Sequence, residues 1–140
     1  MTTCLVREPA TVAAGKPGRS AALAGLRVLL VEDEAMVAMM IEDMLSDLGC
    51  LVIGPASRVS SALDLLDDEA IDAAVLDVNL GGEAVFPVAD RLAAVGVPFV
   101  FSTGYGLAGL DDRHAARPVL QKPYSRDRLG AALAGALGLS

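Results

Sequence analysis

The sequence has few of the features that mark secreted or membrane proteins. It contains only two cysteines, Cys4 and Cys50, which form no CxxC pair and have no metal-binding residues beside them. Nothing therefore requires an oxidising compartment or a thiolate metal site, and Cys50 is expected to be a small core residue. No apolar run approaches the roughly 20 residues needed to cross a bilayer. Arg7, Glu8 and Pro9 interrupt the start of the chain, so no signal peptide is predicted, and we expect a cytoplasmic protein with no membrane contact.

Positive charge is also scarce, since the net charge is −7 and no cluster of lysine or arginine occurs. Proteins bind nucleic-acid backbones through concentrated positive charge, so we predict that nucleic acid is not a direct partner. The single histidine, His114, has no second histidine or cysteine nearby and is predicted to lie at the surface.

The chain has 140 residues, which is enough for one domain and a short N-terminal tail. Residues 1–25 are rich in Thr, Ala, Gly and Pro without periodicity, so they are predicted to be a flexible tail, and residues 26–140 the folded domain. From Leu26 onward, short apolar runs alternate with amphipathic stretches. The runs are Leu26–Val31, Cys50–Ile53, Ala73–Leu76, Val97–Phe101 and Val119–Leu120.

The amphipathic stretches predict helices, because their apolar residues recur at helical spacing. The first contains Val37, Met40, Ile41, Met44, Leu45 and Leu48; the second Val59, Ala62, Leu63 and Leu66; the third Val85, Val88, Ala89 and Leu92; the last Leu129, Ala132, Leu133, Ala136 and Leu137. Met36 and Met39 lie beside the first stripe and, like Met40 and Met44, are expected to pack, although any exposed methionine would suit a docking surface.

Residues at the ends of these helices support the assignment. Gly49 is placed to end the first helix, and Ser57 and Ser125 precede the second and the last as N-caps. Pro87 is tolerable only in the first turn of the third helix. Residues 107–116 are weakly patterned, so a fourth helix in the alternation should be short or irregular.

Strict alternation of five runs with helices predicts an α/β domain, with a parallel sheet covered by helices on both faces. Ligand sites in such sheets lie beyond the carboxyl ends of the strands. The residues that follow the runs there are Glu32, Asp33, Glu34, Asp77, Ser102, Thr103 and Lys122.

Carboxylates gathered at one edge of a sheet need a cation or a raised pKa. Two of them about 4–5 Å apart repel by roughly 3–4 kcal/mol at an effective dielectric constant near 20. A site made of oxygen ligands suits Mg²⁺ better than zinc or copper. A lysine opposite the carboxylates would neutralise a second anion, for which a phosphoryl group is the natural candidate. With a metal and a lysine to neutralise its charge, an aspartate can accept that group and become an acyl phosphate.

The segments VLLVEDE, AVLDVNL, FSTGY and LQKPY, in that order, resemble the signature residues of bacterial two-component response-regulator receiver domains over about residues 26–139. The resemblance implies a doubly wound, flavodoxin-like sheet with strand order 2-1-3-4-5. It makes Asp77 the phosphoacceptor and Thr103 and Lys122 its partners. Glu32, Asp33, Asp77 and the backbone carbonyl of Asn79 would hold Mg²⁺, and the Lys122–Pro123 bond would be cis.

The spelling PFVFSTGYG with RPVLQKPY is similar to a receiver subgroup with a Phe-Ala-Thr-Gly-Tyr motif, many of whose members are stand-alone receivers. Two departures from the common pattern stand out. Most receivers carry a proline four residues after the acceptor aspartate, whereas Gly81 and Gly82 occupy that loop here. The loop should therefore be more mobile. Val119 occupies the usual position of the aromatic switch residue, so Tyr105 and Tyr124 are candidate substitutes, each weighed against ordinary half-buried packing.

The main hypothesis is a single-domain response regulator rather than an enzyme. A histidine kinase or histidine phosphotransfer protein would phosphorylate Asp77. Because the chain ends at Ser140 directly after the last predicted helix, output would be contact with another protein or return of the phosphoryl group to a kinase network. One alternative is a degenerate receiver that only binds partners. Another is a Mg²⁺-dependent phosphatase, which usually carries a general-acid aspartate where this chain has Asn79.

Overall fold

The sheet is five-stranded and parallel, as predicted. The computed structural model describes residues 23–104 and 117–139. The strands follow the order β2-β1-β3-β6-β7, which is the predicted 2-1-3-4-5 because β6 and β7 are the fourth and fifth strands of this sheet. Their bounds are β1 Arg27–Val31, β2 Leu51–Ala56, β3 Ala73–Asp77, β6 Phe99–Thr103 and β7 Val119–Gln121.

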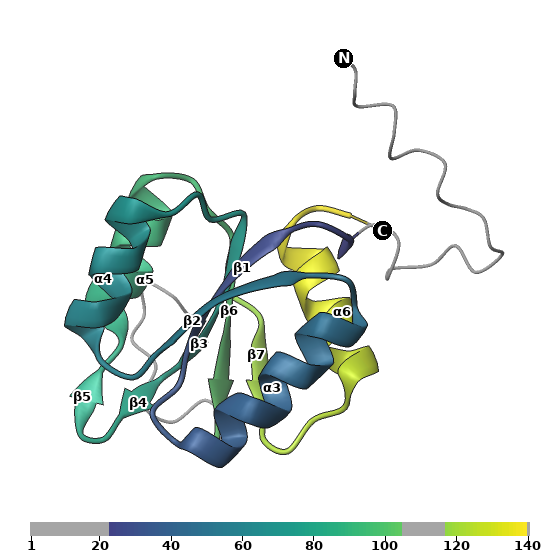
Figure 1. Ribbon diagram of the computed structural model, residues 1–140, viewed down its shortest axis with the longest axis horizontal. Coiled ribbons are helices and arrows are strands. Elements are labelled where there is room, and N and C mark those ends of the chain that lie inside the picture. The colour runs from purple at the N-terminus through teal and green to yellow at the C-terminus, as the bar shows by residue number, and fades with distance from the viewer. Residues whose placement is uncertain (1–22, 105–116, 140) are drawn as a thin grey trace, which may run out of the picture.

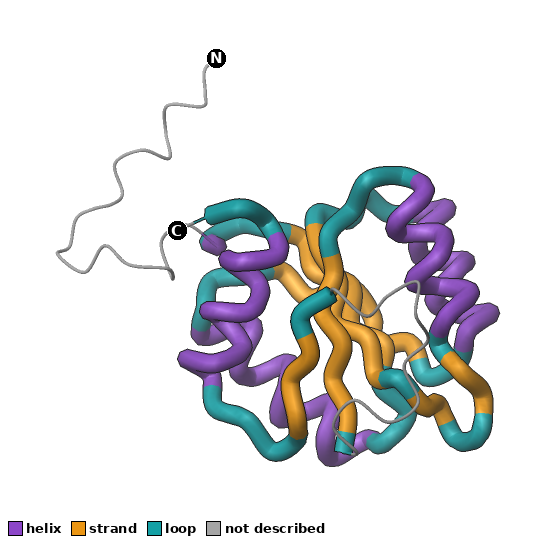
Figure 2. The backbone as a smooth tube through the Cα atoms, turned by 180° about the vertical axis from the view of Figure 1, so that it is seen from behind, coloured by secondary structure: helices purple, strands orange, loops and turns teal. Residues whose placement is uncertain are grey.

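Among the residues that the structure describes, two helices cover each face of the sheet, as Figures 1 and 2 illustrate. Helices α3 (Ala35–Asp47) and α6 (Arg126–Ala136) pack on one face, over a core that includes Leu30 and Val75. Helices α4 (Val59–Asp68) and α5 (Phe86–Ala94) pack on the other, over a core that includes Phe99 and Phe101. The central strands β3 and β6 are buried along their whole length, which explains their continuous apolar runs.

Most predicted helix ends are confirmed. Gly49 follows α3 with a φ of 90°, a backbone conformation that glycine adopts without strain. Ser125 caps α6, where its hydroxyl accepts a hydrogen bond from the Arg128 N–H at 3.2 Å. Pro87 lies in the first turn of α5. The Ser57 cap is wrong: Arg58 is the N-cap of α4, and the carboxylate of Glu83 accepts the Val59 N–H at 3.2 Å instead.

A two-stranded hairpin was not predicted. Strands β4 (Asn79–Leu80) and β5 (Glu83–Ala84) pair antiparallel across a turn in which both glycines have positive φ, Gly81 at 63° and Gly82 at 97°. Such a two-residue turn matches the twist of paired strands. The Asn79 side-chain carbonyl accepts the Gly82 N–H at 2.7 Å. The segment that we expected to be a mobile loop is thus shaped as a hydrogen-bonded hairpin.

The methionines of α3 do not all pack as predicted. Met44 lies against the core, but Met36, Met39 and Met40 are 78%, 61% and 51% exposed. Cys50 is buried, as expected, and burial raises the pKa of its thiol to about 11. Both the Lys122–Pro123 and the Gly54–Pro55 bonds are cis, of which the first was expected.

The packed chain begins before the predicted boundary at residue 26, because the Leu23 side chain is fully buried against the α3 and α6 face. Residues 1–22 of the predicted tail, the weakly patterned segment 107–116, Tyr105 and His114 lie outside the described residues. Among the described residues, none of the helices has the length and apolar character that crossing a membrane requires.

Candidate functional site

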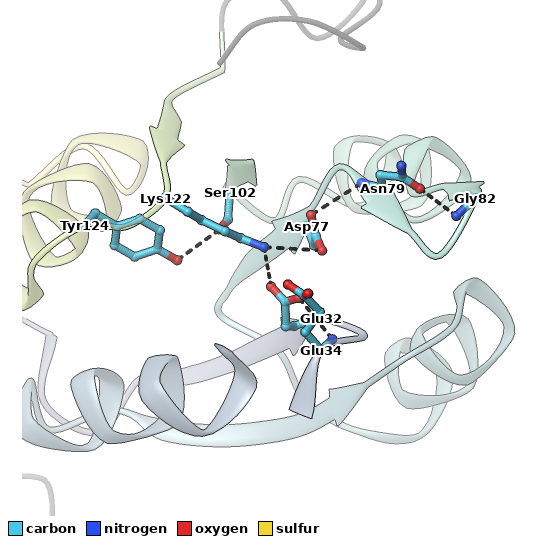
Figure 3. A network of polar contacts seen from close by, with 8 residues as sticks. All are labelled: Glu32, Glu34, Asp77, Asn79, Gly82, Ser102, Lys122 and Tyr124. Atoms are coloured by element: carbon cyan, nitrogen blue, oxygen red, sulfur yellow. Dashed lines mark hydrogen bonds and ion pairs between the residues drawn. The ribbon is translucent and has the colours of Figure 1, made fainter. Parts of the chain in front are cut away.

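The candidate site lies at the carboxyl end of the sheet, where adjacent strands bring distant residues together (Figure 3). Glu32 follows β1, Asp77 ends β3, and Lys122 follows β7. The Lys122 ammonium donates a hydrogen bond to Glu32 Oε1 at 2.9 Å and lies 3.5 Å from Asp77 Oδ2. Three residues predicted from separate motifs are therefore in direct contact.

The two carboxylates in this contact are buried. Glu32 is 2% exposed and Asp77 7%. Glu32 also accepts a hydrogen bond from the Glu34 N–H through Oε2, and Asp77 Oδ1 lies 3.4 Å from the Asn79 nitrogen that donates to it. One ammonium thus faces two buried carboxylates, an arrangement that leaves negative charge to be neutralised.

The pKa values of Asp77 and Lys122 reflect the excess of negative charge at this buried site. Burial, followed by the repulsion of Glu32, raises the pKa of Asp77 to about 7 despite the attraction of Lys122. Burial by itself lowers the pKa of Lys122. The hydrogen bond to Glu32 and the charges of both carboxylates outweigh that effect and leave the pKa above its ordinary value. A second cation would relieve the repulsion that raises the pKa of Asp77.

Three carboxylates are placed to hold such a cation. Glu32, Asp33 and Asp77 each offer an oxygen, and these oxygens all lie within 4.8 Å of one another. A cluster made of carboxylate oxygens matches the ligand preference of Mg²⁺. Bound there, Mg²⁺ would supply positive charge that neutralises the oxygens of a phosphoryl group. The backbone carbonyl of Asn79, in the adjoining hairpin, remains the predicted fourth ligand.

Two residues with hydroxyl groups lie at the end of β6, the strand next to β3. Thr103, at the end of β6, is 2% exposed, and its neighbour Ser102 is the register partner of Asp77 between β3 and β6. The Ser102 hydroxyl lies 3.1 Å from the Tyr124 hydroxyl, within hydrogen-bond distance. Burial raises the pKa of Tyr124, and the hydrogen bond to Ser102 offsets part of that effect. The sequence showed Ser102 beside the site but carried no signal for its pairing with Tyr124.

Comparison with known proteins agrees with this geometry. The family described as "Response regulator receiver domain" matches residues 28–134. The transcriptional regulatory protein TcrA of Mycobacterium tuberculosis is 35% identical over 90% of this chain and 52% of its own length. The sensory transduction protein LytT of Bacillus subtilis is 33% identical over 74% of this chain and 45% of its own. The chain therefore spans about half the length of these two relatives.

A solved structure is similar over nearly its whole length. The solution structure of SdrG from Sphingomonas melonis Fr1 has a TM-score of 0.74 at 48% identity, covering 81% of this chain and 97% of that one. A BeF3-activated conformation of SdrG, described from Pseudomonas melonis Fr1, has a TM-score of 0.70 at 47% identity, covering 81% and 98%.

Proposed function

The chain belongs to the family of response regulator receiver domains, and on that premise we propose that it accepts a phosphoryl group on Asp77 and signals by protein contact. The observation that carries the proposal is the contact between Lys122, Glu32 and Asp77, set within a cluster of three carboxylates. The donor would be a histidine kinase or a histidine phosphotransfer protein.

The roles proposed for the side chains are those that the resemblance to receiver domains implies for these positions. A carboxylate oxygen of Asp77 attacks the phosphorus of a phosphohistidine, an O–P bond forms, and the N–P bond breaks with its electron pair returning to the imidazole. The Lys122 ammonium pairs with an oxygen of the transferred group. The Thr103 hydroxyl turns toward another oxygen and donates a hydrogen bond. Incubation with Mg²⁺ and a small phosphodonor tests the proposal, because the intact chain should gain one phosphoryl group.

Membership of the Phe-Ala-Thr-Gly-Tyr subgroup is part of the proposal. Its support is the segment PFVFSTGYG, whose residues Phe99–Thr103 form the buried strand β6. The 48% identity to SdrG supports a different part of the proposal, a response to beryllofluoride, because SdrG has a described BeF3-activated conformation. We expect the acyl phosphate or its beryllofluoride mimic to shift this chain between two arrangements of the loops around Asp77.

Tyr124 is proposed to relay that shift to α6. It follows Lys122 closely in the chain, its hydroxyl pairs with Ser102, and its ring packs against the core under α6. In Tyr124→Phe, loss of the hydrogen bond should lower the free energy of unfolding by about 1 kcal/mol. The amide chemical shifts of α6 should then respond less to beryllofluoride than in the wild type. An unchanged α6 response would mean that Tyr124 only packs, the ordinary role weighed against it.

The exposed methionines of α3 are proposed to form the docking surface for the phosphodonor protein. This methionine surface consists of Met36, Met39 and Met40, on the helix that begins directly after the acidic residues of the site. Flexible, polarizable methionines adapt to a partner surface. Met36→Lys/Met39→Lys should slow transfer from a histidine kinase active on the wild type by at least about tenfold, because buried anchors at interfaces each contribute about 1–2 kcal/mol.

The rate of modification by a small phosphodonor separates docking from chemistry. It should stay within about twofold of the wild type in the double variant, because both methionines are mostly exposed and neither belongs to the acidic cluster. Val95→Lys is the matched control, since Val95 is 62% exposed and lies beyond α5 on the other face of the sheet. Equal loss with kinase and small donor, or equal loss in the Val95 control, would contradict a docking role.

A further inference from the structure

The β4–β5 hairpin borders the acidic cluster but is too short to be stable by itself. Its strands are two residues each, joined by two register pairs, Asn79↔Ala84 and Leu80↔Glu83. Isolated hairpins are marginal even when longer, so contacts outside the hairpin must set its position. At its base, the Val85 N–H donates to the Val78 carbonyl at 3.1 Å, and the Leu80 side chain is buried in the core.

Glu83, in β5, makes a contact outside the hairpin. Its carboxylate accepts the Val59 N–H of α4 at 3.2 Å, across 24 positions of the sequence. The N-cap residue of α4, Arg58, provides no side-chain hydrogen bond to the helix. The amino end of a helix has unpaired N–H groups and favours negative charge. Glu83 therefore caps α4 and, by the same bond, fastens β5 to it; Figure 1 shows the hairpin beside these elements.

The opposite strand of the hairpin lies against the site. The Asn79 N–H donates to Asp77 Oδ1, and the Asn79 side chain holds Gly82 (Figure 3). At the turn, a β-carbon on Gly81 would lie 3.2 Å from Asp33 Oδ2. Moving the hairpin by a few tenths of an ångström would thus alter the surroundings of both Asp33 and Asp77.

We propose that Glu83 is a positioning residue for the acidic site: by capping α4 it holds the β4–β5 hairpin where Asn79 and Gly81 border Asp77 and Asp33. The biological role of this positioning rests on the proposed function, whereas the contact between Glu83 and α4 does not. With Glu83 in this role, the affinity of the carboxylate cluster for Mg²⁺ depends on a side chain outside the cluster. Hydrogen bonds that orient metal ligands commonly affect metal affinity in this way.

Three variants test this inference. In Glu83→Ala, the Val59 amide should exchange with solvent faster, and the Mg²⁺ dissociation constant, measured from amide chemical shifts, should rise about fivefold for loss of one hydrogen bond. Glu83→Gln keeps an oxygen that can accept the same hydrogen bond and should restore both values to within about twofold. Asp67→Ala is the matched control, because it removes the exposed Asp67–Arg91 ion pair that joins α4 to α5 away from the site. It should leave Mg²⁺ binding unchanged.

Wild-type Mg²⁺ affinity in Glu83→Ala would overturn the inference, and so would an equal shift in the Asp67 control. Thermal unfolding followed by circular dichroism confirms that each variant is folded at the temperature of the titration. The proposed function is tested separately by modification of the wild-type chain. If that chain binds Mg²⁺ but gains no phosphoryl group from any donor, the proposed function is wrong. The Mg²⁺ titration of the Glu83 variants still decides the role of Glu83.

Discussion

Asp77→Asn should gain no phosphoryl group under conditions in which the wild-type chain gains one. The amide of asparagine is a poor nucleophile and cannot form the acyl phosphate, whereas its size lets it occupy the same buried position at the end of β3. Wild type and variant are incubated with Mg²⁺ and phosphoramidate or acetyl phosphate, and their intact masses are compared. Removing Mg²⁺ with a chelator beforehand should reduce the wild-type adduct to the background of the variant.

The matched control is Asp72→Asn, which makes the same change just before the other end of β3. Asp72 accepts the Arg27 N–H at 2.8 Å and lies at the amino end of the strand, away from the acidic cluster. It should be modified as fast as the wild type. An adduct that persists in Asp77→Asn would place the acceptor elsewhere. A wild-type chain that neither gains an adduct, from small donor or kinase, nor binds beryllofluoride would be a degenerate receiver that acts only by binding.

The sheet could be predicted from sequence because its central strands are covered on both faces. Full burial favours apolar residues along most of a strand, which produced runs such as Ala73–Leu76, and the alternation of these runs with helices predicted a parallel sheet. The strand order itself was implied by the resemblance to receiver domains. The strand ends were harder to predict. Strands β3 and β6 continue through Asp77 and Thr103, because the hydrogen-bonded ladder extends to polar residues that hydropathy does not mark. Those polar ends are part of the candidate site.

The contacts that position the site could not be predicted, for reasons of distance and conformation. A cap supplied by Glu83, 24 positions from Val59, leaves no local pattern, whereas the local signal at Ser57 pointed to the wrong residue. Adjacent glycines favour either a mobile loop or a two-residue turn, and only the pairing of Asn79 with Ala84 decides between them. The Tyr124–Ser102 contact likewise depends on the packing of a loop against a strand.

Lys122→Met should lower the free energy of unfolding by about 3 kcal/mol in buffer without Mg²⁺. The Glu32 side chain is fully buried and receives a hydrogen bond from Lys122 at 2.9 Å. Removing one partner of a buried pair leaves the other charge without compensation, which typically costs about 3–5 kcal/mol. Here the loss also leaves Glu32 facing Asp77, whose ionisation it already opposes. Urea unfolding followed by circular dichroism measures the change.

The double variant Lys122→Met/Glu32→Gln distinguishes charge imbalance from loss of packing. If the cost comes from an unpaired Glu32 carboxylate, neutralising that carboxylate should recover about 2 kcal/mol of the loss, a strongly non-additive result for two residues in contact. If Lys122 matters only through its aliphatic stem, the two losses should add. Arg126→Met is the control, because it breaks an exposed pair with Asp47 at 3.6 Å and should change stability by less than about 1 kcal/mol. Recovery in the double variant would show that Lys122 balances the buried charge of the unphosphorylated site. The same ammonium is then already in place for the phosphoryl group that Asp77 is proposed to accept.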